Sequence, residues 1–211
     1  MELKILEVGP LEANCYIVYD KANGIVIDAG GDEDKILEFL NKQKIDVKYI
    51  LLTHGHYDHI SGISGLAEKL NAPIYLHNLD LKMYNAQESI IRNISGRPLY
   101  TKFQNYNFFE KYFITDNLYF EVIHTPGHSK GSICILFPSQ KIMFTGDTLF
   151  FENIGRTDLP GGDDHEMAQS LKKLMEYNDY IVYPGHGPKT TIEYEQENNY
   201  YIKEYFERFI N

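Results

Sequence analysis

The stretch Thr53-His-Gly-His-Tyr-Asp-His59 decides the fold of this 211-residue chain, because it places four metal-ligand side chains within six residues. It directly follows the apolar run Tyr49-Ile-Leu-Leu52, which predicts a buried strand. Imidazole nitrogens and carboxylate oxygens are zinc ligands, and the spacing differs from the i, i+4 pair of helical metalloproteases. Alternate residues of an extended segment point the same way. We therefore expect His54 and His56 to face one metal ion, and Asp58 and His59 to turn toward another.

Three further candidate ligands occur in the same local setting, each just after a predicted strand and directly after a glycine. They are His128 in Thr125-Pro-Gly-His-Ser, Asp147 in Phe144-Thr-Gly-Asp-Thr and His186 in Tyr183-Pro-Gly-His-Gly. A single loop histidine is more often a surface or hydrogen-bonding residue, but the recurrence of this setting indicates a common site. Two metal ions that share one carboxylate would use all seven side chains, and such a pair can hold a hydroxide and polarise a carbonyl group.

The pattern of apolar runs predicts two packed β-sheets with helices outside them, an α/β layered fold. We expect strands at 3–8, 15–19, 25–28, 49–52, 73–76, 118–124, 132–137, 141–145 and 180–183, and helices at 34–44, 60–70, 165–175 and 191–209. No linker divides the chain, so we expect one domain over residues 1–211. The aromatic stretch 84–113 is expected to pack locally or at a subunit contact, with a cover over the site as the alternative.

Composition excludes several classes of protein. The chain has 20 Lys and Arg against 30 Asp and Glu, a formal charge of −10, which argues against binding to nucleic acid or to an anionic membrane. Cys15 and Cys134 are too few for a disulfide framework and lie in apolar runs, so we expect reduced core residues. Without a signal-peptide core or a long apolar span, a cytoplasmic protein is expected. The remaining histidines, His77, His124 and His165, are interpreted as structural.

The motifs together resemble those of the metallo-β-lactamase-fold hydrolases, most closely the glyoxalase II-like (hydroxyacylglutathione hydrolase-like) branch. The matching positions are the histidine-rich stretch 53–59, Pro-Gly-His128, Gly-Asp147-Thr-Leu-Phe150, Gly155-Arg156, Pro-Gly-His186-Gly, the opening Gly9 to Ile17 and Ile27-Asp-Ala-Gly30. They span nearly the whole chain. The resemblance implies a four-layer αββα sandwich with the metal ions at one edge of the sheets.

The resemblance also implies roles for the candidate ligands. His54, His56 and His128 would hold the first metal ion, Asp58, His59 and His186 the second, and Asp147 would bridge them. β-Lactamases of this fold lack the bridging aspartate, which makes antibiotic hydrolysis a weaker expectation. The implied reaction is hydrolysis of a hydroxyacyl-glutathione type thioester by a metal-bridging hydroxide that Asp58 helps to orient. Zinc is the expected metal, with iron or manganese as alternatives.

The chain departs from full glyoxalase II enzymes in one respect. Those enzymes continue into a C-terminal helical domain that helps bind glutathione, whereas here one final helix follows Gly187. Arg156 occupies the position of the family's basic residue that contacts the substrate's carboxylate, and a surface salt bridge is the other interpretation. Asp28 is interpreted either as a residue that holds a ligand histidine by its second nitrogen or as a turn former.

Other functions remain open on the sequence alone. A persulfide dioxygenase would use one iron on His54, His128 and Asp147, since two histidines and a carboxylate suit non-haem iron. A lactonase on the same fold is a further alternative, and a metal-binding or partner module without catalysis is a third. The expected partner is a small-molecule thioester, with no nucleic acid and no membrane, and the expected state is a monomer or homodimer. Metal content and turnover discriminate among these alternatives.

Overall fold

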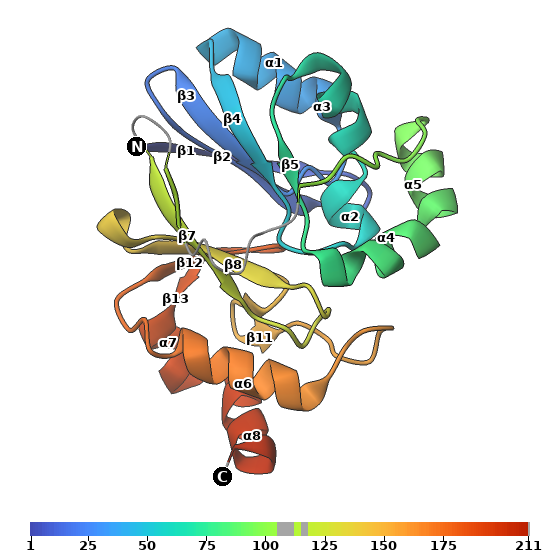
Figure 1. Cartoon of the computed structure of the whole chain (residues 1–211). Coiled ribbons are helices and arrows are strands. Elements are labelled where there is room, and N and C mark those ends of the chain that lie inside the picture. The colour runs from blue at the N-terminus through green and yellow to red at the C-terminus, as the bar shows by residue number, and fades with distance from the viewer. Residues whose placement is uncertain (105–111, 115–117, 211) are drawn as a thin grey trace.

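Two mixed β-sheets face each other in this protein (Figure 1). The computed structural model describes residues 1–104, the backbone of 112–114, and residues 118–210. The first sheet has the order β1 (Glu2–Val8), β2 (Ala13–Asp20), β3 (Asn23–Ile27), β4 (Asp46–Leu51) and β5 (Ile74–Tyr75). Its first two pairings are antiparallel and its last two parallel.

The second sheet is built from the other half of the chain. Its order is β13 (Thr190–Thr191), β12 (Ile181–Pro184), β9 (Ile142–Gly146), β8 (Ile133–Phe137), β7 (Tyr119–His124) and β6 (Tyr112–Ile114). Only the pairing of β12 with β9 is parallel among these described strands. A short hairpin, β10 (Leu149–Phe150) and β11 (Asn153–Ile154), follows β9.

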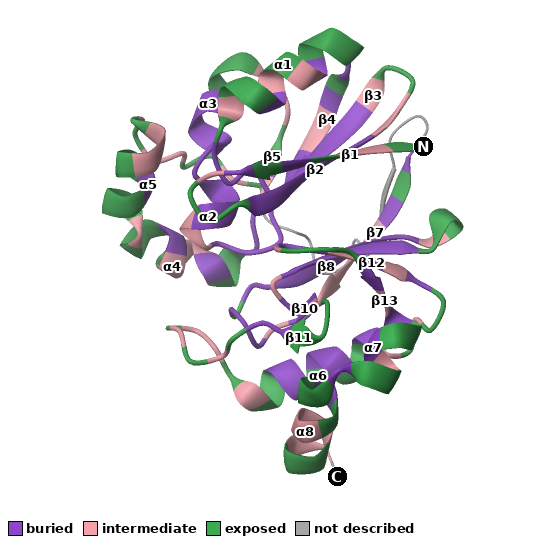
Figure 2. Cartoon of the chain, turned by 180° about the vertical axis from the view of Figure 1, so that it is seen from behind, coloured by how far each residue is buried: buried purple, intermediate pink, exposed green. Residues whose placement is uncertain are grey.

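The central strands are apolar throughout because both of their faces are buried. On β2, Tyr16 and Val18 pack in the core between the sheets, while Cys15 and Ile17 pack beneath the outer helices. Side chains of a strand alternate between its two faces, so an uninterrupted apolar run fits a strand covered on both sides. Figure 2 shows these inner strands as mostly buried and the outward faces of the helices as exposed.

Helices cover the outer face of each sheet. α1 (Glu33–Gln43) and α3 (Ile63–Lys69) bury Ile36 and Leu66 against the first sheet. α6 (Asp164–Leu174) and α8 (Tyr200–Phe209) bury Leu171 and Ile202 against the second. The shorter helices are α2 (Tyr57–Ile60), η1 (Asn78–Asp80), α4 (Leu81–Ala86), α5 (Glu88–Ser95), η2 (Pro138–Gln140) and α7 (Ile192–Asn198). The expected αββα sandwich is confirmed.

Two helix predictions were wrong in detail. The predicted helix 60–70 is found as α3, which begins at Ile63, and a separate helical turn, α2, ends at Ile60 and contains Asp58 and His59. The predicted helix 191–209 is broken at Asn199, whose backbone is extended and whose side chain accepts hydrogen bonds from Tyr201 N and Ile202 N. A residue that caps a helix start cannot continue the preceding helix, so α7 and α8 are separate.

The aromatic stretch 84–113 packs locally where the structure describes its side chains. Tyr84 is buried, its hydroxyl donates to Tyr100 O at 2.8 Å, and Phe103 packs against both rings. The remaining aromatic residues, from Tyr106 to Phe113, lie outside the described side chains. The alternative prediction, that this stretch covers the site, depends on these residues and stays a prediction. None of the helices in the described residues has the length and apolar character needed to cross a membrane.

Candidate metal centre

All seven predicted ligands come together at one edge of the sandwich. His54 to His59 follow β4, His128 lies in the loop between β7 and β8, and Asp147 and His186 follow β9 and β12. β4 belongs to the first sheet and the other strands to the second. The centre is therefore assembled between the two sheets, from loops held by rigid strands.

Ligand atoms converge in three overlapping groups whose members lie within 4.8 Å of one another. One group is His54, His56 and His128, and another is Asp58, His59 and His186. These sets coincide with those that the family resemblance implies for two metal ions. The third group joins His54, His59 and Asp147 across the other two.

Asp147 lies in the middle of the array. Its Oδ1 is 3.3 Å from His59 Nε2. Its Oδ2 is 3.5 Å from His128 Nε2, 3.8 Å from His186 Nε2 and 3.9 Å from His54 Nε2. A carboxylate in contact with members of both ligand sets is in the position that a bridging ligand needs.

The donor set fits divalent metal ions. His54 Nε2 and Asp147 Oδ1 are buried and form no hydrogen bond within the described residues. Buried polar atoms without a partner are costly, and a cation at this point would satisfy them. Nitrogen and oxygen donors at a loop edge suit zinc, iron or manganese.

Burial and neighbouring charges set the protonation of the ligands. Burial lowers the pKa of His54 well below its usual value and lowers the pKa of His56 to about 4. Burial opposes ionisation of Asp147, but the adjacent His59 holds the pKa of this carboxyl well below its usual range. Neutral rings at His54 and His56 and an ionised Asp147 are forms that bind a metal ion. Burial opposes protonation of His59, but the carboxylates of Asp147 and Asp28 raise the pKa of this ring well above its usual value, so a metal ion would displace its proton.

Hydrogen bonds outside the ligand array fix the orientation of three rings. Asp28 Oδ2 lies 2.9 Å from His59 Nδ1 and accepts a hydrogen bond from Thr53 Oγ1, which lies 3.1 Å from His54 Nδ1. On the other side, Arg156 O lies 2.9 Å from His128 Nδ1. Each contact leaves Nε2 directed toward the centre, as second partners of metal-binding histidines do. The structure thus places Asp28 where the first of its two interpretations requires.

Two glycines allow the close approach of the ligand loops. A Cβ atom on Gly185 would lie 2.1 Å from Asp147 Oδ1 and 2.7 Å from His59 Cε1. Gly146 has a φ of 49°, and a Cβ there would lie 2.4 Å from Thr53 Oγ1. Any side chain at these positions would displace the ligands or the residues that orient them, which explains glycine before Asp147 and His186.

Two polar residues that the sequence analysis did not single out hold the ligand loops together. Asp80 is buried and accepts hydrogen bonds from Gly55 N at 2.9 Å, Ser129 Oγ at 2.7 Å and Gly131 N at 2.6 Å. Gln87 accepts from Tyr57 N and donates to Gly55 O. Asp80 lies 25 residues beyond Gly55 in a polar segment, so no local pattern connects it with the ligands.

The N-terminal segment supports the loop that carries His186. Asn14 Nδ2 donates to Pro184 O and Gly187 O, both at 3.0 Å, and the Tyr16 hydroxyl donates to Pro184 O. These contacts cross 168 to 173 residues of sequence. These contacts explain how the opening segment, Gly9 to Ile17, supports the position of His186.

Arg156 is exposed rather than part of the buried array. Its Nε and Nη2 donate to the two carboxylate oxygens of Asp158, each at 2.7 Å. Arg156 nevertheless lines the cavity that also includes His56, Asp58, His128 and Asp147 in its lining. Arg156 thus forms the surface salt bridge of one interpretation and also lines the cavity beside the candidate ligands.

The two cysteines and the three remaining histidines lie outside the centre. Cys15 and Cys134 are fully buried, and burial raises the pKa of the Cys134 thiol to about 12, so neither is a ready nucleophile. His77 stacks on His124 with ring centroids 4.7 Å apart, and His165 packs against Phe209. Their structural interpretation agrees with these contacts.

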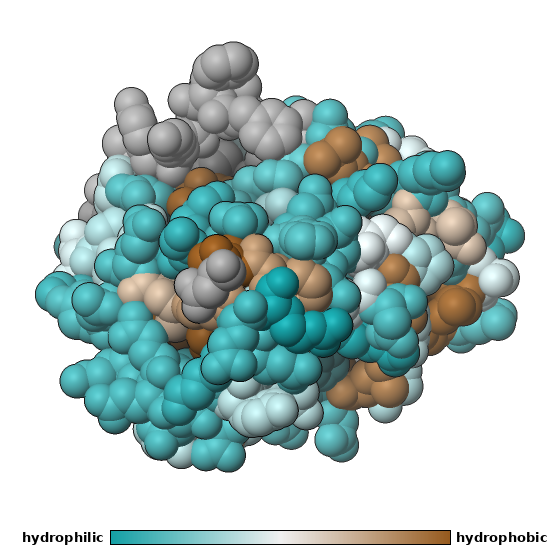
Figure 3. Space-filling model, turned by 90° about the horizontal axis from the view of Figure 1, so that it is seen from below, coloured by the Kyte–Doolittle hydropathy of each residue, from teal (hydrophilic) through white to brown (hydrophobic). Residues whose placement is uncertain are grey.

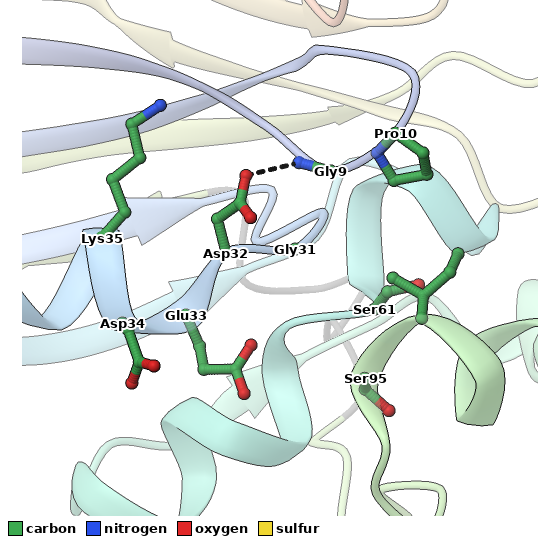
Figure 4. Close-up of a pocket in the computed structure, with 10 residues that line it drawn as sticks. Gly9, Pro10, Gly31, Asp32, Glu33, Asp34, Lys35, Ser61 and Ser95 are labelled. Carbon is green, nitrogen blue, oxygen red and sulfur yellow. Dashed lines mark hydrogen bonds between the residues drawn. The ribbon is translucent and has the colours of Figure 1, made fainter.

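A second cavity of about 620 Å³ is separate from the ligand array (Figure 4). Its acidic lining comes from the start of α1, where Asp32 accepts a hydrogen bond from Gly9 N and Glu33 pairs with Arg97. No predicted ligand lines it. Because Asp32 and Glu33 have partners within the described fold, we interpret the cavity as structural.

Comparison with known proteins places the chain in a family. The model of the metallo-beta-lactamase superfamily matches residues 8–186. The chain is 32% identical to hydroxyacylglutathione hydrolase GloC of Haemophilus influenzae, covering 96% of this chain and 98% of that protein. It is 31% identical to the probable metallo-hydrolase YqgX of Bacillus subtilis, covering 96% and 98%.

Solved structures agree with this placement. The BLEG-1 B3 metallo-beta-lactamase is similar with a TM-score of 0.84, 32% identity and coverage of 95% of this chain and 99% of that one. TTHA1623 in a di-iron-bound form is similar with a TM-score of 0.82, 34% identity and coverage of 94% and 99%. The family model and these relatives cover nearly the whole fold, including the strands and loops that carry the ligand array. The chain belongs to the metallo-beta-lactamase superfamily.

Proposed function

We propose that this chain is a glyoxalase II-like hydrolase that uses two divalent metal ions, most readily zinc, to cleave thioesters of the hydroxyacyl-glutathione type. The observation that carries the proposal is the position of Asp147 between the two ligand groups. The similarity to the Haemophilus influenzae hydroxyacylglutathione hydrolase supports the choice of substrate. The substrate would be a small molecule, and we expect a cytoplasmic monomer or homodimer that binds neither nucleic acid nor membrane.

Each candidate ligand would have a defined role in this reaction. His54, His56 and His128 would hold one metal ion, and Asp58, His59 and His186 the other, with Asp147 shared. Bound divalent ions lower the pKa of water toward neutrality and polarise a carbonyl group. Asp58 Oδ2 lies 3.2 Å from His186 Nε2, and we assign Asp58 the further task of orienting the attacking oxygen. A thiolate leaves readily, so no general acid is needed.

The orienting residues keep this array from rearranging. Asp28 fixes the ring of His59, and the carbonyl of Arg156 fixes that of His128. Such preorganisation removes reorganisation from the reaction step, which is the main source of electrostatic catalysis. Gly185 leaves the room between the two ligand groups that a side chain would fill.

The test is elemental analysis of protein purified without chelators, together with hydrolysis of S-lactoylglutathione. We expect about two metal ions per chain and turnover. His186→Ala should lose about one metal ion and most activity, whereas His165→Ala, which changes a histidine outside the centre, should retain both. One iron per chain, oxygen consumption with a persulfide and no hydrolysis would replace the proposal with the dioxygenase.

A β-lactam assay belongs in the same experiment, because one similar structure is a B3 metallo-beta-lactamase. We expect thioester hydrolysis to exceed β-lactam hydrolysis. The reverse order would assign the centre to antibiotic hydrolysis. Turnover of a lactone in place of both substrates would assign it to the lactonase, and metal binding without turnover of any of these substrates would indicate a binding module.

A further inference from the structure

The cavity above the metal ligands carries information about the substrate. It encloses about 680 Å³ and includes His56, Asp58, His128 and Asp147 in its lining. A volume of this size is typical of sites that enclose a drug-sized molecule. A lactoyl group, with three carbon atoms, would fill only a small part of this volume, so the cavity has room for the thiol part of a thioester and for a longer acyl chain.

One side of the cavity is apolar. η1, α4 and α5 contribute Leu79, Met83 and Ile90, and Leu11 and Leu159 line it from other loops. Met83 reaches the ligand loop, since its Cε lies 3.3 Å from the position of a Cβ on Gly55. The apolar lining therefore begins directly beside the metal ligands.

Several of these apolar side chains are open to solvent. Leu11 is 51% exposed, Leu79 50% and Ile90 43%. The surface in Figure 3 is mostly hydrophilic, with hydrophobic residues gathered in small patches. Exposed apolar residues that cluster around a cavity indicate a surface that a ligand covers.

Cations accompany the apolar side chains. Lys82, Lys130 and Arg156 line the same cavity. Arg156 is paired with Asp158, but neither lysine ammonium forms an ion pair within the described part of the chain. On a chain with a formal charge of −10, two unpaired cations beside the candidate centre favour an anionic ligand.

We propose that the cavity binds an amphipathic anionic thioester, with an acyl group larger and more apolar than lactoyl and with carboxylates on the thiol. Leu79, Met83 and Ile90 would contact the apolar part, and Lys82 and Lys130 would contact the anionic part. This inference rests on the proposed thioester hydrolysis. It assigns the specificity of that reaction to residues of η1, α4 and α5.

The first test measures binding without catalysis. S-Methylglutathione and S-hexylglutathione are thioethers that cannot be hydrolysed and differ only in apolar length. Calorimetry with the metal-loaded protein should show the hexyl compound binding at least about tenfold more tightly, because each buried methylene contributes to affinity. Equal affinities for the two compounds would overturn the proposal.

Two sets of variants locate the effect. Leu79→Ser and Ile90→Ser should each reduce the preference for the hexyl compound several-fold, whereas Ile5→Ser, a similarly exposed residue on β1, should preserve it. Lys82→Ala with Lys130→Ala should weaken S-hexylglutathione several-fold but not the uncharged S-hexyl-N-acetylcysteamine. Lys69→Ala on α3 is the matched control. Loss of affinity for both thioethers would contradict the assignment of the lysines.

Turnover separates this inference from the function on which it rests. With glutathione thioesters, kcat/KM should rise about tenfold or more from lactoyl to hexanoyl. Hydrolysis without any chain-length preference would remove the present inference and leave thioester hydrolysis standing. A chain-length preference in thioether binding without hydrolysis of any thioester would remove the proposed function and leave the amphipathic site.

Discussion

Asp28 shows how much of the centre depends on a residue that is not itself a ligand. It has a φ of 54°, in the left-handed region, and its backbone N donates to Leu51 O. That conformation turns its carboxylate back onto Thr53 and His59, with hydrogen bonds of 2.7 to 2.9 Å. The turn-forming interpretation and the ligand-holding interpretation of Asp28 thus describe one arrangement.

Replacement of Asp28 by Asn separates the carboxylate from the backbone conformation, because Asn tolerates the left-handed region. We expect Asp28→Asn to weaken metal binding about 10- to 100-fold, the usual effect of removing the second partner of a ligand histidine. Competition with a chromogenic chelator measures this. Asp32→Asn is the control, since Asp32 is also left-handed but accepts its hydrogen bond from Gly9 N away from the ligands. Equal metal affinity in the two variants would show that Asp28 is only a turn former.

Asp80 makes a different prediction, because it holds backbone rather than rings. An amide in its place would present N–H groups to donors on the loops of His56 and His128. We expect Asp80→Asn to lower the free energy of unfolding by about 1–3 kcal/mol, the cost of unsatisfied buried groups. Urea denaturation with and without metal measures the effect. Asp34→Asn, at an exposed position of α1, should change the free energy of unfolding by less than about 0.5 kcal/mol. An equal loss in both variants would contradict the role assigned to Asp80.

At the level of elements, the apolar runs predicted most strands closely and the helix boundaries less well. β2 and β8 were predictable because continuous Ile, Val, Leu and Tyr residues fit strands buried on both faces. The short strands β10, β11 and β13 have only two residues each, too few for a periodic signal. The break between α7 and α8 was missed because Asn199 makes it through contacts that the helical pattern does not contain.

Asn199 therefore offers a test of how the C-terminal helices are attached. It caps α8, donates to Asn153 O at 3.1 Å and donates to Glu195 Oε2 at 2.7 Å. We expect Asn199→Ala to reduce the free energy of unfolding by about 1–3 kcal/mol through the lost cap and the lost hydrogen bonds to Asn153 O and to the buried Glu195. Thermal denaturation measures the loss. Asn198→Ala, at the exposed neighbouring position, should be nearly neutral, and a comparable loss there would place the effect in helix propensity instead.

Across the whole molecule, the sequence revealed the candidate ligands but not the contacts that hold them in place. All seven candidates were recognisable because each follows an apolar run, and a shared local setting needs no knowledge of distant contacts. Asp80, Gln87 and Asn14 form hydrogen bonds between segments far apart in the chain, and no local sequence pattern predicts these contacts. Arg156 is intermediate, because its two interpretations were contact with the substrate's carboxylate and a surface salt bridge, and the residue both pairs with Asp158 and lines the cavity.

The distribution of the ligands over the two sheets leads to a prediction about stability. Four candidates follow β4 of the first sheet, and three belong to loops of the second. Metal ions shared between them would join the two halves and would bind the folded chain in preference to the unfolded one. At a free metal concentration about 1,000 times the Kd, such binding adds about 4 kcal/mol. In a chain of this size this corresponds to a Tm increase of about 8–16 °C.

Calorimetry of the purified protein before and after chelation measures this increase. We expect Tm to fall with the chelator and to recover when zinc is added back, because the ligands on each sheet are then joined again. The fall should be smaller in His186→Ala, which we expect to lose one of the two metal ions, and unchanged in His165→Ala, whose ring packs on Phe209. A Tm that does not respond to chelation in a protein shown to contain metal would mean that the ions join no elements that separate on unfolding. The position of Asp147 between ligands of both sheets argues against that outcome.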